Sequence, residues 1–220
     1  MTYSILARDE KTGRFGGAAA TGSFCVGGWV LRGDPRSGMS ASQGTAPSTL
    51  WGEAVLARMR GGMEATAAVE ATVRPDTGRD FRQLAALDPA GGTAAFTGAQ
   101  SLPACAHRSA PGVIVAGNML SGEAVLEGAL ETFLSTTGAF EDRLLAALDA
   151  GETAGSDSRG LLSSALLVVG TDIAPFTLRI DYSETPLADL HTLLGRVRNA
   201  PYHGWLDGVP TLDDPFRAKV

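Results

Sequence analysis

Residues 3–20 read YSILARDEKTGRFGGAAA, and this stretch predicts an antiparallel β-hairpin near the start of the chain. Within residues 3–8, large apolar residues alternate with smaller or polar ones, as they do in a strand with one buried face. Residues 9–13 are turn formers that end in a glycine. Residues 15–20 then return as a strand of mostly small residues. Antiparallel pairing is therefore the first constraint on the fold.

Beyond this hairpin, groups of strands alternate with pairs of helices. Strands are expected at residues 39–43, 82–87, 93–97, 113–116, 165–169 and 176–181, and residues 22–38 are expected to hold strand fragments and loops. Helical spacing of apolar residues predicts helices around residues 51–59, 63–73, 121–134, 144–150 and 186–197. A doubly wound parallel sheet would place one helix after each strand. The order of elements expected here instead favours an α+β fold, in which two stacked antiparallel sheets carry helices on both outer faces.

One domain is expected over residues 1–198, because no linker or internal repeat interrupts them. Residues 199–220 contain three prolines and are expected to form an irregular C-terminal arm packed by Tyr202 and Trp205. In the helix around residues 121–134, the buried stripe is expected to include Leu134.

Composition and charge exclude several classes of protein. The chain has 220 residues, of which 44% are hydrophobic, and a formal net charge of −6. That charge disfavours nucleic acid as a partner, because phosphate binding needs a positive surface. Two cysteines are too few for a secreted disulfide framework or a cysteine metal cluster. With neither a signal peptide nor an apolar run of the ~20 residues that span a bilayer, the chain is expected to be cytoplasmic and to bind no membrane.

The common catalytic and cofactor motifs are missing from the sequence. The only lysines are Lys11 and Lys219, and neither follows a phosphate-binding glycine loop. The histidines, His107, His191 and His203, are scattered and have no metal-binding spacing. We therefore expect no cofactor and no metal, and we expect His107 to lie on a surface hairpin.

Five segments carry a resemblance to a known family: MTYSILARD (1–9), GSFCVGG (22–28), SASQG (40–44), AGNMLSGEAVLEG (116–128) and GSDSRGLLSSALLVV (155–169). In them the sequence resembles a family of uncharacterised bacterial and archaeal proteins that is grouped with the N-terminal-nucleophile (Ntn) hydrolases. The resemblance extends to about residue 195. The element order also looks like that of proteasome β-subunits, which implies a four-layer αββα sandwich.

The resemblance implies a catalytic residue. Ntn hydrolases use the side chain of the first residue of the mature chain as nucleophile and its α-amino group as base. An α-amine has an ordinary pKa of about 7.7–8.0, so it is partly neutral at working pH. Thr2 matches this position once Met1 is removed, and threonine is small enough to permit removal.

Further site residues are implied in the same way. The resemblance suggests Gly44 and Thr45, which join a core strand to the first helix, as backbone donors to a developing oxyanion. It suggests Asn118, Asp157 and Ser164 as groups that position the amine and the substrate. Arg159 is suggested as a bidentate partner for a carboxylate.

Two features weigh against catalysis. Proteasome-like sites place a lysine beside the nucleophile, and this chain has none between Lys11 and Lys219. A retained Met1 would also displace the free amine by about 3.8 Å, beyond the ~2.6–3.2 Å reach of a hydrogen bond to the Thr2 hydroxyl. An amidohydrolase acting on a small molecule or short peptide is thus the first hypothesis. An inactive binding or assembly protein is the second, and a structural homo-oligomer is the third.

Each candidate also has a purely structural interpretation. Asn118 could cap a turn between a strand and a helix, and residues 157–159 could form a solvated loop. Trp29 and Trp51 are expected to be core or interface aromatics. Cys25 and Cys105 are expected to be small buried hydrophobes.

Overall fold

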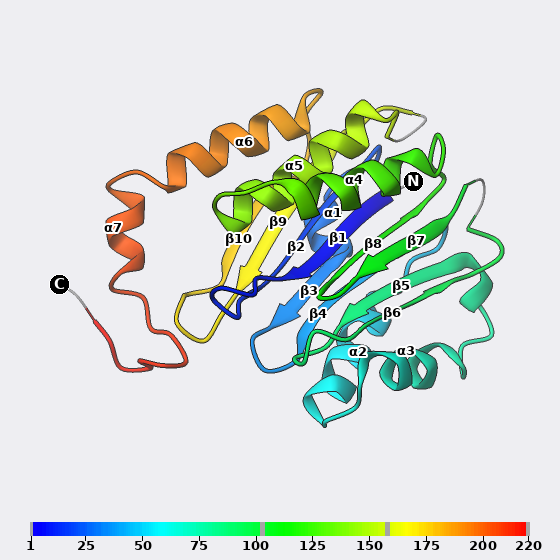
Figure 1. Cartoon of the computed structure of the whole chain (residues 1–220), viewed down its shortest axis with the longest axis horizontal. Helices are drawn as coiled ribbons and strands as arrows, with labels where there is room; N and C mark the ends of the chain where they lie inside the picture. The colour runs from blue at the N-terminus through cyan, green and yellow to red at the C-terminus, as the bar shows by residue number, and fades with distance from the viewer. Residues whose placement is uncertain (1, 102–103, 157–158, 219–220) are drawn as a thin grey trace.

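The computed structural model describes residues 2–101, 104–156 and 159–218, and it contains a six-stranded and a four-stranded sheet (Figure 1). Every strand pair in them is antiparallel. The larger sheet has the order β10 (Phe176–Ile180), β9 (Ser163–Val169), β2 (Phe15–Thr21), β1 (Thr2–Arg8), β8 (Val113–Asn118) and β7 (Ala106–Ala110). The smaller has the order β3 (Leu31–Asp34), β4 (Gly38–Gly44), β5 (Arg82–Leu87) and β6 (Thr93–Thr97). This mixed α+β architecture with two antiparallel sheets confirms the α+β part of the prediction.

The helices pack on opposite sides of the two sheets. Helices α4 (Ala124–Ser135), α5 (Phe140–Thr153) and α6 (Pro186–Val197) contact the six-stranded sheet, whereas α2 (Thr49–Arg60) and α3 (Ala65–Val73) contact the four-stranded sheet (Figure 1). The remaining faces of the two sheets pack against each other around a cluster that includes Leu6, Met39, Leu87 and Ile114.

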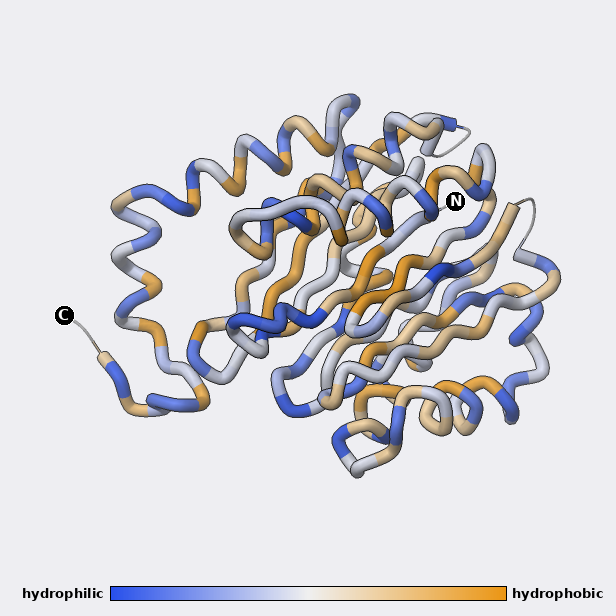
Figure 2. Tube along the Cα trace, viewed as in Figure 1, coloured by the Kyte–Doolittle hydropathy of each residue, from blue (hydrophilic) through white to orange (hydrophobic). Residues whose placement is uncertain are grey.

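Strand periodicity decides which layer each residue enters. On β1, Tyr3, Ile5 and Ala7 belong to the core beneath the helices, while Leu6 belongs to the core between the sheets. This two-residue period follows from the pleat of a strand, whose successive side chains point to opposite faces. Figure 2 shows the hydrophobic residues concentrated along the strands and on the inward faces of the helices. Burial on both faces explains why β1 and β2 are almost entirely inaccessible to solvent.

The region 22–38 differs from expectation, because it holds the short helix α1 (Val26–Trp29) before β3. Two glycines in the sequence VGGW give it a low helix propensity. The glycine at position 27 is needed for packing, since a Cβ there would lie 2.7 Å from the Ala165 side chain and 2.8 Å from that of Arg179. The edge strand β7 was also not predicted from the sequence. More and less exposed residues alternate along this strand, and His107 is one of the exposed ones.

Several aromatic and apolar side chains lie closer to solvent than the sequence suggests. Trp51 is buried, but Leu134 is exposed, so the stripe of α4 ends at Phe133. The C-terminal arm contains the short helix α7 (Tyr202–Leu206), on which Tyr202 and Trp205 are exposed and contact each other rather than packing the arm onto the sheets.

Backbone and side-chain hydrogen bonds between Asp213 and Thr171 tie the arm to the loop after β9. Cys25 and Cys105 are free thiols at partly exposed positions, which corrects the expectation that both are buried.

Candidate functional site

A cavity of about 510 Å³ lies at the end of the molecule where β1 begins and β2, β4 and β8 end. Its walls come from both sheets, from α1 and from the loops that leave the strand ends. The lining residues are Thr2, Thr21, Ser23, Phe24, Val26, Trp29, Val30, Gln43, Gly44, Thr45, Pro47, Met119 and Arg159. A volume of this size is typical of sites for small molecules, which occupy roughly 300–1,000 Å³.

The space between the sheets changes from apolar to polar toward this cavity. At the far end, the side chains that point between the sheets are Leu6, Met39, Leu87 and Ile114. At the cavity end, the same alternation places polar residues between the sheets, namely Thr2, Ser4, Thr21, Gln43, Gln83 and Asn118. Buried polar groups need hydrogen-bond partners, so this end of the core requires a specific arrangement of side chains.

Four of these residues, Ser4, Gln43, Gln83 and Asn118, form a hydrogen-bonded group that we call the amide cluster. The Ser4 hydroxyl donates to Oε1 of Gln43 at 2.9 Å. Nε2 of Gln43 donates to Oε1 of Gln83 at 2.7 Å, and Nδ2 of Asn118 donates to the same oxygen at 3.3 Å. All four are almost completely buried. Because Gln43 and Gln83 lie on one sheet and Ser4 and Asn118 on the other, the amide cluster joins the two sheets beneath the cavity.

Gln83 makes further contacts that bind the cluster to the strands around it. Its Nε2 lies 3.0 Å from the carbonyl oxygens of Ala106 and Gly117 and 2.9 Å from the Thr97 hydroxyl. In contrast, Oδ1 of Asn118 is buried and has no hydrogen-bond partner among the described residues. Asn118 lies directly opposite Thr2 in the pairing of β1 with β8. An unsatisfied acceptor is therefore available next to Thr2.

Thr2 contributes its hydroxyl to the cavity wall. Its Oγ1 is 3.1 Å from Oγ1 of Thr21, the residue opposite it on β2. Nε2 of Gln43 approaches the Thr2 carbonyl oxygen at 3.4 Å. Thr2 is partly buried and is held by neighbouring strands on both sides. Thr2 thus lines the cavity, and its hydroxyl is held beside that of Thr21.

The loop after β4 forms part of the cavity wall, and Gly44, the last residue of β4, precedes it. Gly44 has φ of +131°, and a Cβ there would lie 2.6 Å from the Phe81 carbonyl oxygen and 2.8 Å from Cα of Arg82. The loop is anchored by Arg82, whose guanidinium donates to the Ala46 carbonyl and to Asp76. Burial raises the pKa of the Asp76 carboxyl, but hydrogen bonds from the Gly78 N–H and Arg82 outweigh it, so this pKa lies below its ordinary value.

The structure brings together most of the residues suggested by the sequence. Thr2, Gly44, Thr45 and Arg159 line the cavity, and Asn118 lies at the opposite register position to Thr2. Ser164 lies elsewhere, since its hydroxyl donates to the Pro186 carbonyl at 2.7 Å, beneath α6. Asp157 falls outside the described residues.

Several residues of the site were not anticipated from the sequence. They are Thr21, Phe24, Trp29, Gln43 and Gln83. The sequence does contain a signal for both glutamines. Each lies on the strand face that carries apolar residues elsewhere in β4 and β5. A polar residue on the buried face of a strand is an indicator of a specific role.

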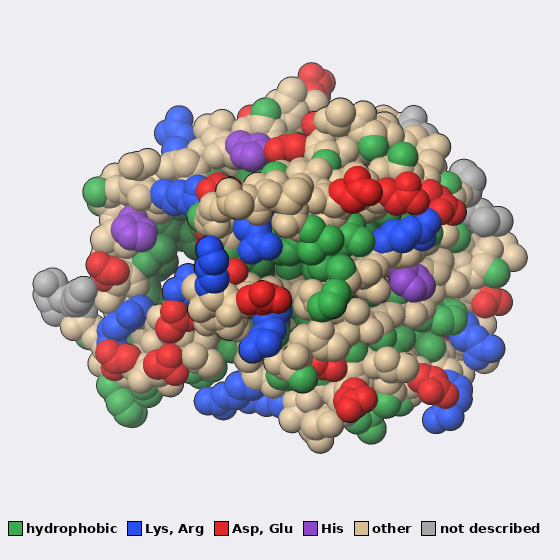
Figure 3. Space-filling view, viewed as in Figure 1, with side chains coloured by type: hydrophobic (Ala, Val, Ile, Leu, Met, Phe, Trp, Pro, Cys, Tyr) green, Lys and Arg blue, Asp and Glu red, His purple; other side chains and the backbone are tan. Residues whose placement is uncertain are grey.

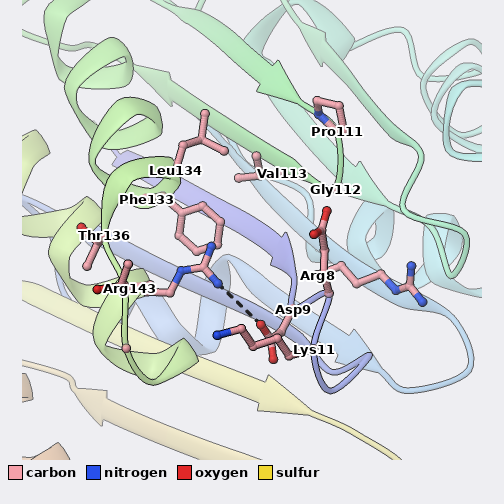
Figure 4. A pocket seen from close by; sticks show the side chains of 13 residues that line it. Arg8, Asp9, Lys11, Pro111, Gly112, Val113, Phe133, Leu134, Thr136 and Arg143 are labelled. Carbon is pink, nitrogen blue, oxygen red and sulfur yellow. Dashed lines mark hydrogen bonds and ion pairs between the residues drawn. The ribbon is translucent and has the colours of Figure 1, made fainter.

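The charge of the cavity comes from Arg159, the one charged residue among its described lining residues. Lys11 lies at the far end of β1, about 20 Å away at the usual rise of a strand. There it borders a separate cavity of about 350 Å³, in which Arg143 points toward Asp9 (Figure 4). Lys219 is outside the described residues.

On the face shown in Figure 3, acidic and basic side chains are interspersed rather than gathered into a basic surface. Within residues 2–101, 104–156 and 159–218, no group of three His, Cys, Asp or Glu side chains is arranged to hold a metal ion. None of the helices in these ranges combines the length and the apolar character needed to cross a membrane.

Comparison with known proteins gives a strong match to a solved structure. The model of a family described as "Family of unknown function (DUF1028)" matches residues 2–190. The crystal structure of protein SPO2555 from Silicibacter pomeroyi, assigned to the same family, is 48% identical with a TM-score of 0.96, and the alignment covers 100% of this chain and 99% of that one. The two molecules therefore share one fold.

Two further solved structures match at low identity. Anbu (ancestral beta-subunit) from Yersinia bercovieri is 13% identical with a TM-score of 0.40, over 88% of this chain and 93% of its own. The Anbu (Gly-1) mutant from Hyphomicrobium sp. strain MC1 is 12% identical with a TM-score of 0.45, over 90% and 96%. The curated proteins contain no significant match.

Proposed function

The chain belongs to the DUF1028 family, a family of unknown function, and from that starting point we propose that it is an Ntn amidohydrolase whose nucleophile is Thr2 after removal of Met1. In this proposal the two sheets and their outer helices correspond to the four-layer αββα sandwich of that class. The position of the Thr2 hydroxyl carries the proposal: it lines a cavity of small-molecule size together with Gly44, Thr45 and Arg159. The substrate would be an amide of a small molecule or short peptide.

The chemistry would proceed in two steps. Oγ1 of Thr2 attacks the amide carbonyl carbon while the α-amine of Thr2 accepts the hydroxyl proton, and the N–H groups of Gly44 and Thr45 donate to the developing oxyanion. The C–N bond then breaks, the amine leaves with that proton, and an ester to Thr2 remains. Water hydrolyses the ester and restores the hydroxyl. The net reaction converts one amide and one water into one acid and one amine.

The proposal needs the neutral α-amine of Thr2 as base, and Asn118, opposite Thr2 in the strand pairing, is placed to orient it. Oδ1 of Asn118 is an acceptor suited to an N–H of this amine, which would satisfy the atom that lacks a partner among the described residues. In this proposal Asn118 orients the amine at a site where proteasome-like enzymes use a lysine.

Two forms of the chain that differ only in Met1 test the proposal. One form begins at Thr2 after cleavage of a fusion directly before it, and the other retains Met1. Each is incubated with a peptide epoxyketone, a reagent that bonds to both the hydroxyl and the amine of an N-terminal threonine, and the products are analysed by intact mass and peptide mapping. We expect one adduct, at Thr2, on the form that begins with Thr2 and none on the other. Equal modification of both forms, or of neither, contradicts the proposal.

A second candidate function is a binding protein with the same cavity and no turnover. The separation of Lys11 from Thr2 favours it, because Lys11 borders the other cavity. This candidate predicts that the natural chain retains Met1 and binds a small molecule at Thr2 without consuming it. Intact mass of the protein isolated from its own host separates the two candidates.

A further inference from the structure

Residues 45–48 connect β4 to α2 and form part of the wall of the cavity that Thr2 lines, to which Thr45 and Pro47 contribute. In the part of the chain that the structure describes, the Thr45 N–H has no acceptor. The proposed function uses this N–H as a donor to the oxyanion. A donor lowers the barrier most when it is aimed before the reaction begins, so the conformation of residues 45–48 bears directly on the rate.

Two hydrogen bonds to backbone carbonyls hold the residues next to this N–H. The Ala46 N–H donates to the Phe81 carbonyl at 3.0 Å, and the Thr45 hydroxyl donates to the Gln100 carbonyl at 3.1 Å. The first of these fixes the peptide group that follows Thr45. The carbonyl of Ala46 belongs to the next peptide group, so neither bond fixes it.

Arg82 supplies the donor for that carbonyl from the neighbouring strand. It lies on β5 directly opposite Gly44 in the pairing of β4 with β5. Its Nη1 donates to the Ala46 carbonyl, two residues beyond the end of β4. A hydrogen bond from a charged donor is stronger than one between neutral groups. Arg82 therefore ties residues 45–48 to the four-stranded sheet at the point where they leave it.

The guanidinium of Arg82 is itself held on two further sides. Its Nε donates to Oδ2 of Asp76 at 2.9 Å, while Oδ1 of Asp76 accepts the Gly78 N–H at 2.7 Å. Its central carbon lies 5.9 Å from the centroid of the buried Trp51 ring. Both side chains of the ion pair are only 23% exposed, so water screens the pair less than it would at the surface. The donor to Ala46 is thus fixed independently of any ligand in the cavity.

We propose that Arg82 is a positioning residue for the reaction at Thr2. Its bond to the Ala46 carbonyl holds residues 45–48 so that the Thr45 N–H remains where the oxyanion develops. Arg82 is not among the described residues that line the cavity, so it acts through this segment and not by touching substrate. The inference rests on the proposed function for the reaction. It predicts a slower chemical step with unchanged binding, because the oxyanion forms only in the transition state.

Inactivation by the peptide epoxyketone tests this in the form that begins with Thr2. The hydroxyl attacks the ketone carbon of this reagent, so an oxyanion develops as in amide hydrolysis, and saturation kinetics separate kinact from KI. For Arg82→Gln we expect kinact to fall by about 10²-fold, as when an oxyanion donor is removed, and KI to stay within about twofold. Arg82→Lys keeps a charged donor and should recover part of kinact.

Two further variants complete the series. Asp76→Asn leaves Arg82 in place but removes the charge that anchors it, so kinact should fall less than in Arg82→Gln. The control is Arg79→Gln. Arg79 is exposed and donates to the Arg74 carbonyl at 3.0 Å, so this change removes a guanidinium–carbonyl bond of the same kind outside the cavity wall and should leave kinact unaltered. Thermal unfolding shows whether each variant is folded at the assay temperature.

Hydrogen exchange of the Ala46 amide, followed by NMR, measures the segment without any reaction. Because this amide bonds to the Phe81 carbonyl within the segment that Arg82 holds, we expect its exchange to become at least about tenfold faster in Arg82→Gln and to stay unchanged in Arg79→Gln. Amides of β1, on the other sheet, should exchange as in the unaltered chain, which distinguishes local loosening from a general loss of stability.

The outcomes separate this inference from the proposed function. If Arg82→Gln keeps the full kinact, or raises KI without lowering kinact, the inference is overturned and the proposed function stands. If no form gives an adduct, the proposed function fails and exchange decides the role of Arg82. Faster exchange at Ala46 then still supports the role of Arg82 in holding residues 45–48, and unchanged exchange overturns it.

Discussion

Replacing Thr2 with alanine is expected to lower kcat/KM for amide hydrolysis by at least ~10³-fold, because the nucleophile is lost while the cavity and its amine remain. Thr2→Ser should keep a substantial part of the activity, since it retains a hydroxyl at the same position. Alanine and serine are both small enough to permit removal of Met1, so the three chains share the same N-terminal chemistry. Steady-state hydrolysis of small-molecule and short-peptide amides measures the effect.

A second threonine provides the control for this experiment. Thr177 lies exposed on the edge strand β10, away from the residues that line the cavity, and Thr177→Ala should leave kcat/KM unchanged. If Thr2→Ala retains full activity, the hydroxyl of another residue performs the attack and Thr2 is not the nucleophile.

Gln83→Leu is expected to lower the free energy of unfolding by at least about 3 kcal/mol, because it leaves buried donors on Gln43 and Asn118 and several buried acceptors without partners. Leucine is close to glutamine in size, so lost hydrogen bonds rather than a cavity account for the change. For a chain of this length the loss corresponds to a fall in Tm of about 6–12 °C. Thermal and urea unfolding measure it.

The control uses the remaining glutamine of the chain, Gln100, which is exposed in the segment that follows β6. Gln100→Leu should change stability by no more than about 0.5 kcal/mol. Because Asn118 would lose its hydrogen bond to Gln83, the Gln83→Leu variant should also react more slowly with the epoxyketone at temperatures where it is fully folded. Unchanged stability in this variant would show that the amide cluster does not hold the sheets together.

Much of this architecture follows from periodicity in the sequence. The opening hairpin, the pair β9 and β10, and the helices α4 and α6 are strongly patterned, and each was predicted close to its observed position. Helix α5 was predicted around residues 144–150 but spans Phe140–Thr153. The local sequence pattern was weakest at α1, where two adjacent glycines oppose helix formation. These glycines are needed because the helix packs against residues that are distant in the sequence. No property of residues 26–29 alone indicates that Arg179 and Ala165 will occupy that space.

Part of the site was predictable from the sequence. The part that was not depends on which face of its strand each residue occupies. Ser163 and Ser164 are adjacent and chemically identical, yet Ser163 supports the turn beside the cavity while Ser164 bonds to the backbone at the start of α6. A shift of one residue moves a side chain to the other face of a sheet. The segment that carries these serines identifies the region, but only the register of β9 against β2 decides which of them supports the turn beside the cavity.

The amide cluster is made of groups that do not ionise between about pH 4 and 9, and a guanidinium stays protonated throughout that range. The amide cluster and the guanidinium would therefore keep the same charge when the pH is lowered or raised within this range. Among the described residues around Thr2, the proposed amine is then the ionising partner of the reaction, and only its neutral form can accept a proton. The rate should accordingly climb with pH along a one-step sigmoid and level off on the alkaline side. A bell-shaped profile would reveal a second proton-exchanging group that the amide cluster does not contain.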